Sequence, residues 1–286
     1  MTDTSREGGS TSGRAAADPG ADPRARVELA DLRRPEAPYL RACLGLDPGH
    51  VPMWIMRQAG RYLPEYRKLK ESYDFLTLSS TPELLTEVTL QPLKRFPMDA
   101  AIVFADIMTP LHSMGFDIDF APGPVIQNPF RGPADVGSLR TPEPEGIAPY
   151  LEEGLRRLAA ELPPHQALIG FSGAPFTLFC YVVEGGGSKD FMTPRSLLRA
   201  EPEAAHTLLS ALADTQVHYL RMQHRAGADA LMIFDSWVGL LSESEYRHFA
   251  MPFVQRILDG LADVPAPVTY FPFGGGPRVC IGNQFA

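Results

Sequence analysis

The sequence predicts an α/β protein built as a (β/α)8 barrel of the TIM type. Short apolar runs alternate with longer amphipathic stretches, a pattern typical of a parallel sheet whose two faces are covered by helices. Polar residues follow several runs at once, including Asp106 after AIVFA, Ser172 after ALIGF and Asp235 after ALMIF. Chemistry collects at the carboxyl ends of parallel strands, so this arrangement favours an enzymatic barrel. A Rossmann sheet is less favoured because no GxGxxG sequence opens a helix after the first strand.

We expect the ordered chain to begin with a helix near Tyr39, where YLRACLGL has helical apolar spacing. The run MWIMR predicts the first strand at 53–57, and a helix follows from Pro64 with Glu65 in its first turn. Further strands are predicted at 100–104, 167–171, 230–234 and 267–271, and further helices at 82–95, 147–161, 202–226 and 243–261. Residues 122–149 are rich in Pro and Gly, which predicts an excursion from the sheet that could include a short strand at 125–130.

The composition is that of an ordinary globular protein and narrows the choice of partners. Hydrophobic residues make up 44% of the 286 residues and charged residues 21%. The net charge of -8 argues against broad binding to nucleic acid or to an anionic membrane, both of which need a basic face. No apolar run approaches the roughly 20 residues of a membrane span, and the N-terminus lacks the apolar core of a signal peptide. Three cysteines are too few for a disulfide framework, so we expect a cytoplasmic protein.

The segment MRQAGRYLPEYR is the densest candidate site. Arg57 and Arg61 stand four residues apart, so their guanidinium groups can share one face of a helix or converge from a turn at Gly60. Each guanidinium matches a carboxylate in a bidentate geometry. Paired surface arginines are the common alternative, but Arg57 directly follows an apolar run. The segment therefore predicts a clamp for carboxylate groups.

This segment resembles the signature of uroporphyrinogen decarboxylases, and three later blocks resemble further conserved segments of that family. They are QPLKRFPMDAAIVFADIMTPLHSMG, ending at Gly115, then GFSGAPFTLFCYVVEGGGSKDF at 170–191 and LMIFDSWVGLLS at 231–242. The blocks keep the order and spacing of the family from about residue 38 to about residue 271. The resemblance implies a homodimeric enzyme that removes CO₂ from the four acetate side chains of uroporphyrinogen III to give coproporphyrinogen III. It also implies that no metal or organic cofactor takes part.

The chemistry of a pyrrole is consistent with a reaction that needs no cofactor. A protonated ring carbon gives an iminium-like cation, which accepts the electrons of the acetate carbon as CO₂ leaves. The protein must therefore bind many carboxylates, stabilise a cationic ring and deliver protons.

The resemblance assigns these tasks to particular side chains. It places substrate binding on Arg57, Gln58, Ala59, Gly60, Arg61, Phe75, Asp106, Tyr181 and Ser236, and catalysis on Asp106, Arg57 and Arg61. Asp106 would stabilise the developing cation through its carboxylate. Four of these residues also have a structural interpretation. Asp106 and Ser236 could cap a helix or turn, and Phe75 and Tyr181 could be packed aromatic residues.

The C-terminal sequence FPFGGGPRVCIGNQFA resembles a different family, the haem-thiolate monooxygenase cytochromes. Their cysteine loop reads F-x-x-G-x-R-x-C-x-G, and its fixed positions are filled here by Phe273, Gly276, Arg278, Cys280 and Gly282. From average amino-acid composition, the probability that all five fixed positions match by chance at a given starting residue is on the order of 10⁻⁷. In that family the cysteine thiolate binds haem iron. We do not expect this of Cys280, because sixteen residues supply no helical scaffold for the two faces of a porphyrin.

These observations divide the chain into a disordered tail at 1–37, a partial decarboxylase barrel at 38–271 and the haem-loop-like tail at 272–286. A complete barrel takes roughly 250 residues, and the pattern contains five or six strands, so we expect the last βα units to be missing. Two alternatives remain. One is a non-catalytic fragment or hybrid that binds porphyrin or haem without turnover. The other is a corrinoid-dependent methyltransferase, which is less favoured because its zinc site needs a His-x-Cys pair that this sequence lacks.

Overall fold

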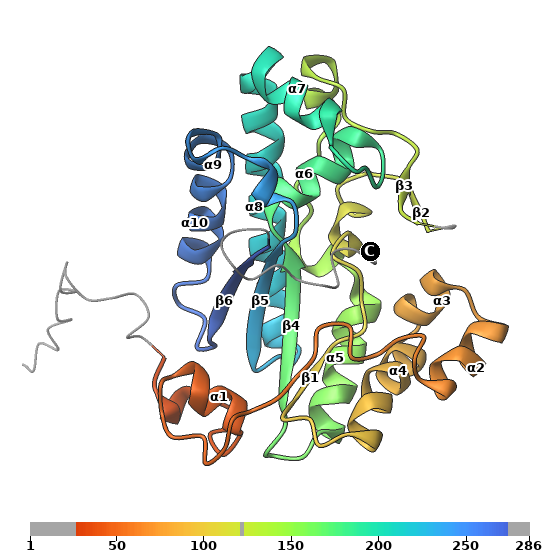
Figure 1. Ribbon diagram of the computed structural model, residues 1–286, viewed down its shortest axis with the longest axis vertical. Coiled ribbons are helices and arrows are strands. Elements are labelled where there is room, and N and C mark those ends of the chain that lie inside the picture. The colour runs from red at the N-terminus through yellow and green to blue at the C-terminus, as the bar shows by residue number, and fades with distance from the viewer. Residues whose placement is uncertain (1–26, 121–122, 274–286) are drawn as a thin grey trace, which may run out of the picture.

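The computed structural model describes residues 27–120 and 123–273 (Figure 1). Its main sheet is four-stranded and parallel, in the order β1-β4-β5-β6. The strands are β1 (Ala100–Ile102), β4 (Ala167–Gly173), β5 (Ala230–Asp235) and β6 (Val268–Pro272). A parallel sheet with a helical crossover between successive strands is the architecture of a TIM-type barrel, so the predicted fold class is confirmed.

Helices cover the sheet between successive strands (Figure 1). They are α1 (Pro38–Cys43), α2 (Pro64–Ser72), α3 (Phe75–Ser80), α4 (Pro82–Arg95), α5 (Pro149–Glu161), α6 (Pro175–Glu184), α7 (Met192–Ala200), α8 (Pro202–Arg225), α9 (Glu243–Phe249) and α10 (Met251–Gly260). Several begin with proline at the first helical position, where its fixed φ fits and its missing N–H costs no hydrogen bond. Helix α8 packs on β4 and β5, and α4 packs on β1.

Strand β5 shows how the two sides of the sheet differ. Leu231 and Ile233 belong to a buried apolar cluster that includes the inner faces of α6 and α8. Met232 and Phe234 belong to a second cluster, in which Phe234 lies 5.6 Å from Phe171 of β4 between ring centroids. Side chains alternate along a strand, so Asp235 falls on the same side as Leu231 and Ile233, toward the helices.

The excursion predicted after β1 is confirmed. A hairpin of β2 (Ile118–Asp119) and β3 (Val125–Ile126) pairs in antiparallel fashion, outside the main sheet. Figure 1 shows this hairpin and α7 near the end of the sheet at which β4 terminates. The hairpin therefore lies at the carboxyl ends of the strands, where the candidate site residues gather.

The strand predicted at 53–57 is wrong. Residues 51–55 run past the start of β1, but only short contacts join them, including Asp99 N–H to the Met53 carbonyl at 2.8 Å. Met53 and Ile55 are 42% and 51% exposed, so their apolar character does not reflect burial in a sheet. A continuous apolar run has no alternation of apolar and polar residues that would identify a strand. The sequence of this run therefore could not show whether a neighbouring strand was available for pairing.

The helix predicted at 243–261 is divided in two. Ala250 has φ −126° and ψ −59° between α9 and α10, and Pro252 stands in the first turn of α10. Proline cannot donate the hydrogen bond that would continue α9, which explains the break. The other predicted helices are confirmed to within about two residues, and 82–95 matches the bounds of α4. Within the described ranges, no helix has the length and apolar character needed to cross a membrane.

Candidate active site

The RQAGR segment forms a turn and not a helix, which decides between the two geometries left open by the sequence. Arg57 is exposed and has φ 59°, in the left-handed region that costs a side chain with a Cβ roughly 1–2 kcal/mol. Gln58 is fully buried beneath it. The Gln58 amide donates to the Ala100 carbonyl at 3.1 Å and accepts from the Ile55 N–H at 3.2 Å. Gln58 therefore fastens the turn to β1 with its side chain.

The second half of the turn presents Arg61 to solvent. The Leu63 N–H donates to the Gly60 carbonyl at 3.0 Å, and the Arg67 guanidinium donates to the Arg61 carbonyl at 2.8 Å. Ala59 packs against the small buried cluster that contains Leu63. These contacts hold the backbone around Arg61 while its guanidinium group stays exposed.

Asp106 lies beyond the carboxyl end of β1, within reach of the charge of Arg57. Its Oδ1 accepts the Met108 N–H at 2.8 Å, so it does cap the short turn that follows. Burial raises the pKa of Asp106, while the Met108 hydrogen bond and the positive charge of Arg57 act in the opposite direction. The capping role and a role beside the substrate are therefore compatible, because the carboxylate retains a second oxygen and a cationic neighbour.

Tyr181 on α6 joins these two residues electrostatically. Burial raises the pKa of Tyr181, the negative charge of Asp106 adds to that rise, and the positive charge of Arg57 opposes it. The Tyr181 ring packs edge-on against Phe191 and Trp237, with centroid distances of 5.8 and 6.1 Å. The fold thus brings Arg57, Asp106 and Tyr181, from three separate segments, to one end of the sheet.

The two remaining predicted site residues, Ser236 and Phe75, come from segments far apart in the chain. Ser236 directly follows β5 and is half-buried, between Asp235 and Trp237. Phe75, at the start of α3, lies 5.6 Å from Phe104 and is also half-buried. Phe75 therefore packs against a neighbouring ring, as the structural alternative expected. Its partner Phe104 stands two residues before Asp106 in the sequence.

Three residues of this region were missed by the sequence analysis as parts of the site. The rings of Phe191 and Trp237 lie 4.6 Å apart between centroids, tilted by 51°, and form the aromatic group around Tyr181. Asp235 is fully buried, and burial raises its pKa to about 6. The position of Trp237 next to the predicted site residue Ser236 could have suggested that it belongs to the site. Its contact with Phe191 could not be predicted, because the two residues lie far apart in the chain.

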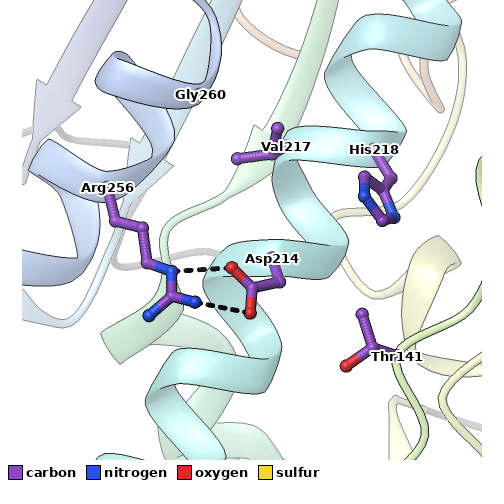
Figure 2. Close-up of a pocket in the computed structure, with 6 residues that line it drawn as sticks. All are labelled: Thr141, Asp214, Val217, His218, Arg256 and Gly260. Atoms are coloured by element: carbon purple, nitrogen blue, oxygen red, sulfur yellow. Dashed lines mark hydrogen bonds and ion pairs between the residues drawn. The ribbon is translucent and has the colours of Figure 1, made fainter.

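A hollow of ≈ 380 Å³ lies elsewhere, between α8 and α10, with Thr141 and His218 among its lining residues (Figure 2). Figure 2 shows that Arg256 is bound by Asp214 through two hydrogen bonds, of 2.6 and 2.8 Å. An anionic ligand in this hollow would need the guanidinium group of Arg256, which is already paired with the Asp214 carboxylate. None of the residues that line this hollow is a candidate site residue.

The haem-loop-like tail lies almost wholly outside the described residues, and Cys280 with it. Its first part is visible: the Phe273 ring is buried 6.2 Å from Phe234, and the Phe273 N–H donates to the Asp235 carbonyl at 3.0 Å. Among residues 27–120 and 123–273, no group of three or more His, Cys, Asp or Glu side chains could hold a metal ion. The absence of a cofactor and the resemblance of the tail both stay predictions.

Comparison with known proteins identifies the family. The model of the uroporphyrinogen decarboxylase family matches residues 34–280, against the expected range of 38–271. The uroporphyrinogen decarboxylase of Citrifermentans bemidjiense is 45% identical over 246 residues, which cover 86% of this chain and 73% of that protein. That of Geobacter metallireducens is 47% identical over 238 residues, covering 83% and 70%.

A solved structure agrees on the fold. A methyltransferase from Methanosarcina mazei superposes with a TM-score of 0.63 at 16% identity, over 82% of this chain and 68% of that one. At this identity the likeness concerns the fold alone and gives no support to a methyltransferase activity. Taken with the matched family model and the relatives at 45–47% identity, these results show that the chain belongs to the uroporphyrinogen decarboxylase family.

Proposed function

We propose that this chain decarboxylates the four acetate side chains of uroporphyrinogen III to give coproporphyrinogen III, without a metal or an organic cofactor. The observation that carries the proposal is the convergence of Arg57, Asp106 and Tyr181 at the carboxyl end of the sheet, in a member of this family. The three side chains supply a cation for carboxylates, an anion for a cationic ring and a hydroxyl group for a substrate oxygen.

Substrate binding falls to the RQAGR turn. The exposed guanidinium groups of Arg57 and Arg61 offer planar donor pairs to acetate or propionate carboxylates. The turn is held by the Gln58 side chain, so the ring-bearing substrate meets a surface that is already in place. Gln58 thus serves substrate binding through the shape of the turn, together with Ala59 and Gly60. Phe75 supplies apolar surface beside the turn, and Tyr181 and Ser236 donate to carboxylate oxygens from the other side.

The reaction removes one carboxyl group at a time. A proton adds to the α carbon of the pyrrole, next to the carbon that bears the acetate, and the resulting cation is delocalised over the acetate-bearing carbon and the ring nitrogen. The bond between the methylene and carboxyl carbons breaks, its electrons return to the ring and CO₂ leaves. A second proton adds at the methylene carbon to give the methyl group, and the first proton is released. Each cycle therefore consumes one proton and one carboxylate and yields one CO₂.

Asp106 is the residue that we expect to matter most to the rate. The half-buried carboxylate of Asp106 accepts the pyrrole N–H groups and stabilises the positive charge that develops on the ring. Burial raises its pKa, and the neighbouring Arg57 favours the ionised form that this task requires. Turnover should therefore fall as the pH drops through the raised pKa of Asp106.

The experiment that tests the proposal separates binding from chemistry. Uroporphyrinogen III carrying ¹³C in the acetate carboxyl groups is mixed anaerobically with the purified chain, and labelled CO₂ is measured alongside quenching of tryptophan fluorescence. The proposal predicts quenching followed by release of labelled CO₂. Quenching without CO₂ would contradict it and favour a porphyrin-binding fragment.

The assembly and location of the protein stay predictions. We propose a homodimer, as the family resemblance implies, which light scattering coupled to size-exclusion chromatography would test. A cytoplasmic location and the absence of nucleic-acid binding rest on cysteine usage and on the net charge of -8.

A further inference from the structure

A hydrogen-bond network centred on two buried side chains lies beneath the candidate site and takes no part in the proposed reaction. At the end of β5, Asp235 accepts from two hydroxyl groups: Thr177 of α6 at 2.7 Å and Tyr270 of β6 at 2.9 Å. Asp235 and Thr177 are both fully buried. A buried carboxylate is a costly way to join elements that apolar side chains could join equally well. Its presence at this place calls for a role beyond packing.

The Thr177 hydroxyl acts both as a hydrogen-bond donor and as an acceptor. It donates its single proton to Asp235 and accepts the backbone N–H of Trp237 at 3.1 Å. Since Asp235 can only accept when ionised, it fixes the direction of the Thr177 proton and leaves a lone pair of the oxygen free for Trp237. The network therefore controls the backbone just after Ser236.

The position of Trp237 has a direct effect on the site. Its ring lies 4.6 Å from Phe191 and 6.1 Å from Tyr181 between centroids. Thr177 and Tyr181 lie one turn apart on α6, so the same helix holds the backbone of Trp237 and carries the ring that Trp237 contacts. A shift of the Ser236–Trp237 backbone would displace both the Ser236 hydroxyl and one wall around Tyr181.

We infer that Thr177 and Asp235 are positioning residues, which hold the Ser236–Trp237 segment against Tyr181 so that substrate carboxylates meet a preformed surface. The inference rests on the proposed function, because Ser236 and Tyr181 are substrate contacts only there. Neither Thr177 nor Asp235 needs to touch the substrate. The hydrogen bond from Tyr270 belongs to the same carboxylate but leads to β6 and away from Trp237.

The test compares substitutions at Thr177 in the full chain. Thr177→Val keeps the shape and removes both hydrogen bonds, whereas Thr177→Ser keeps both. All variants are made with Trp54→Phe, so that Trp237 is the remaining tryptophan. We expect Thr177→Val to shift the Trp237 emission and to raise the KM for uroporphyrinogen about tenfold, with kcat changed less than twofold. Thr177→Ser should restore both values, and Tyr270→Phe should leave KM unchanged.

A purely structural role predicts a different result. Thr177→Val would then lower the melting temperature while KM, kcat and Trp237 emission of the folded protein stay within twofold of the parent, and this outcome would overturn the inference. If Thr177→Val does not fold, Thr177→Ala takes its place with the same expectations, because it only removes atoms and cannot clash.

Failure of the proposed function remains distinguishable. Uroporphyrin, the oxidised macrocycle with the same carboxylates, serves as a probe that is not turned over. A parent that binds uroporphyrin without releasing CO₂ from uroporphyrinogen overturns the proposed function, and the ratio of uroporphyrin Kd values between Thr177→Val and Thr177→Ser still tests the positioning role. A parent that binds no uroporphyrin overturns both.

Discussion

Arg57 combines an exposed guanidinium group with a backbone conformation that disfavours any side chain. Its φ of 59° would suit glycine, yet the chain keeps arginine there, next to a turn fixed by Gln58. Strain of this kind persists where the surroundings impose it, and it is concentrated at functional sites. Substitutions at Arg57 should therefore change substrate binding and the free energy of unfolding in different ways.

Two substitutions at Arg57 exploit this property. Arg57→Ala and Arg57→Gly should each weaken uroporphyrin binding by about 1.5–3 kcal/mol for each lost charged contact. Arg57→Gly should be more stable to urea than Arg57→Ala by about 1 kcal/mol, because glycine adopts the positive φ without strain. Arg247→Ala serves as the control, since Arg247 is an exposed arginine paired with Glu243 on α9. Equal binding by Arg57→Ala and Arg247→Ala would refute the clamp.

Asp106 should affect the rate more than the affinity. Asp106→Asn keeps the size of the side chain and its hydrogen bond to the Met108 N–H, but removes the charge that stabilises the cationic ring. We expect kcat to fall by about 10²–10³ with a smaller change in uroporphyrin Kd, as measured by steady-state kinetics and fluorescence quenching. Asp259→Asn, at an exposed position on α10, is the matched control. A loss confined to affinity would show that Asp106 only binds substrate.

Asp235 should leave a signature in the pH dependence of stability. Its folded pKa of about 6 lies above the ordinary 3.8, so the folded chain keeps the proton at a pH where the unfolded chain has lost it. The contribution of Asp235 to the free energy of unfolding therefore falls as pH rises from about 4 to above 6. Between those limits the parent should lose about 2–3 kcal/mol relative to Asp235→Asn in urea melts. A constant difference across that window would contradict the raised pKa.

At the scale of elements, helices with strong local signals could be predicted and strands without visible partners could not. The bounds of α4 follow from Pro82, the apolar spacing and the basic last turn, all of which lie within the helix itself. The runs at β4 and β5 are buried along their whole length and were predicted as strands. The run at 53–57 looks similar in sequence, but whether a strand forms there depends on pairing with residues far along the chain.

The turn between α8 and β5 offers a test of how these elements are held. Gly227 has φ +123°, and an added Cβ would lie 2.5 Å from the Cβ of Ala159 on α5. Gly227→Ala should therefore lower the free energy of unfolding by more than about 2 kcal/mol, through strain and overpacking together. Gly137→Ala meets no atom within 4 Å and has no positive φ, so urea melts of this control should match the parent. Similar stability of the two variants would show that α5 can move away from the turn.

At the scale of the whole molecule, the fold class could be predicted from the alternation of apolar runs and amphipathic stretches. The site could not be predicted in the same way. Arg57 was selected from its own segment, but the roles of Asp106 and Tyr181 came from the family resemblance, and the proximity of the three charges depends on the fold. Asp235 was predicted only as a polar residue at a strand end, and Trp237 and Phe191 were not predicted, because their contacts link segments that lie far apart in the chain.

The central claim is that the group formed by Arg57, Asp106 and Tyr181 removes CO₂ from a bound porphyrinogen. The most direct measurement incubates the purified chain with uroporphyrinogen III under anaerobic conditions and separates the oxidised products by chromatography, with Asp106→Asn treated in parallel. We predict porphyrins with successively fewer carboxyl groups, ending in coproporphyrin, and little product from Asp106→Asn. Unchanged uroporphyrin from a folded parent that binds it, or equal product from both proteins, would contradict the account.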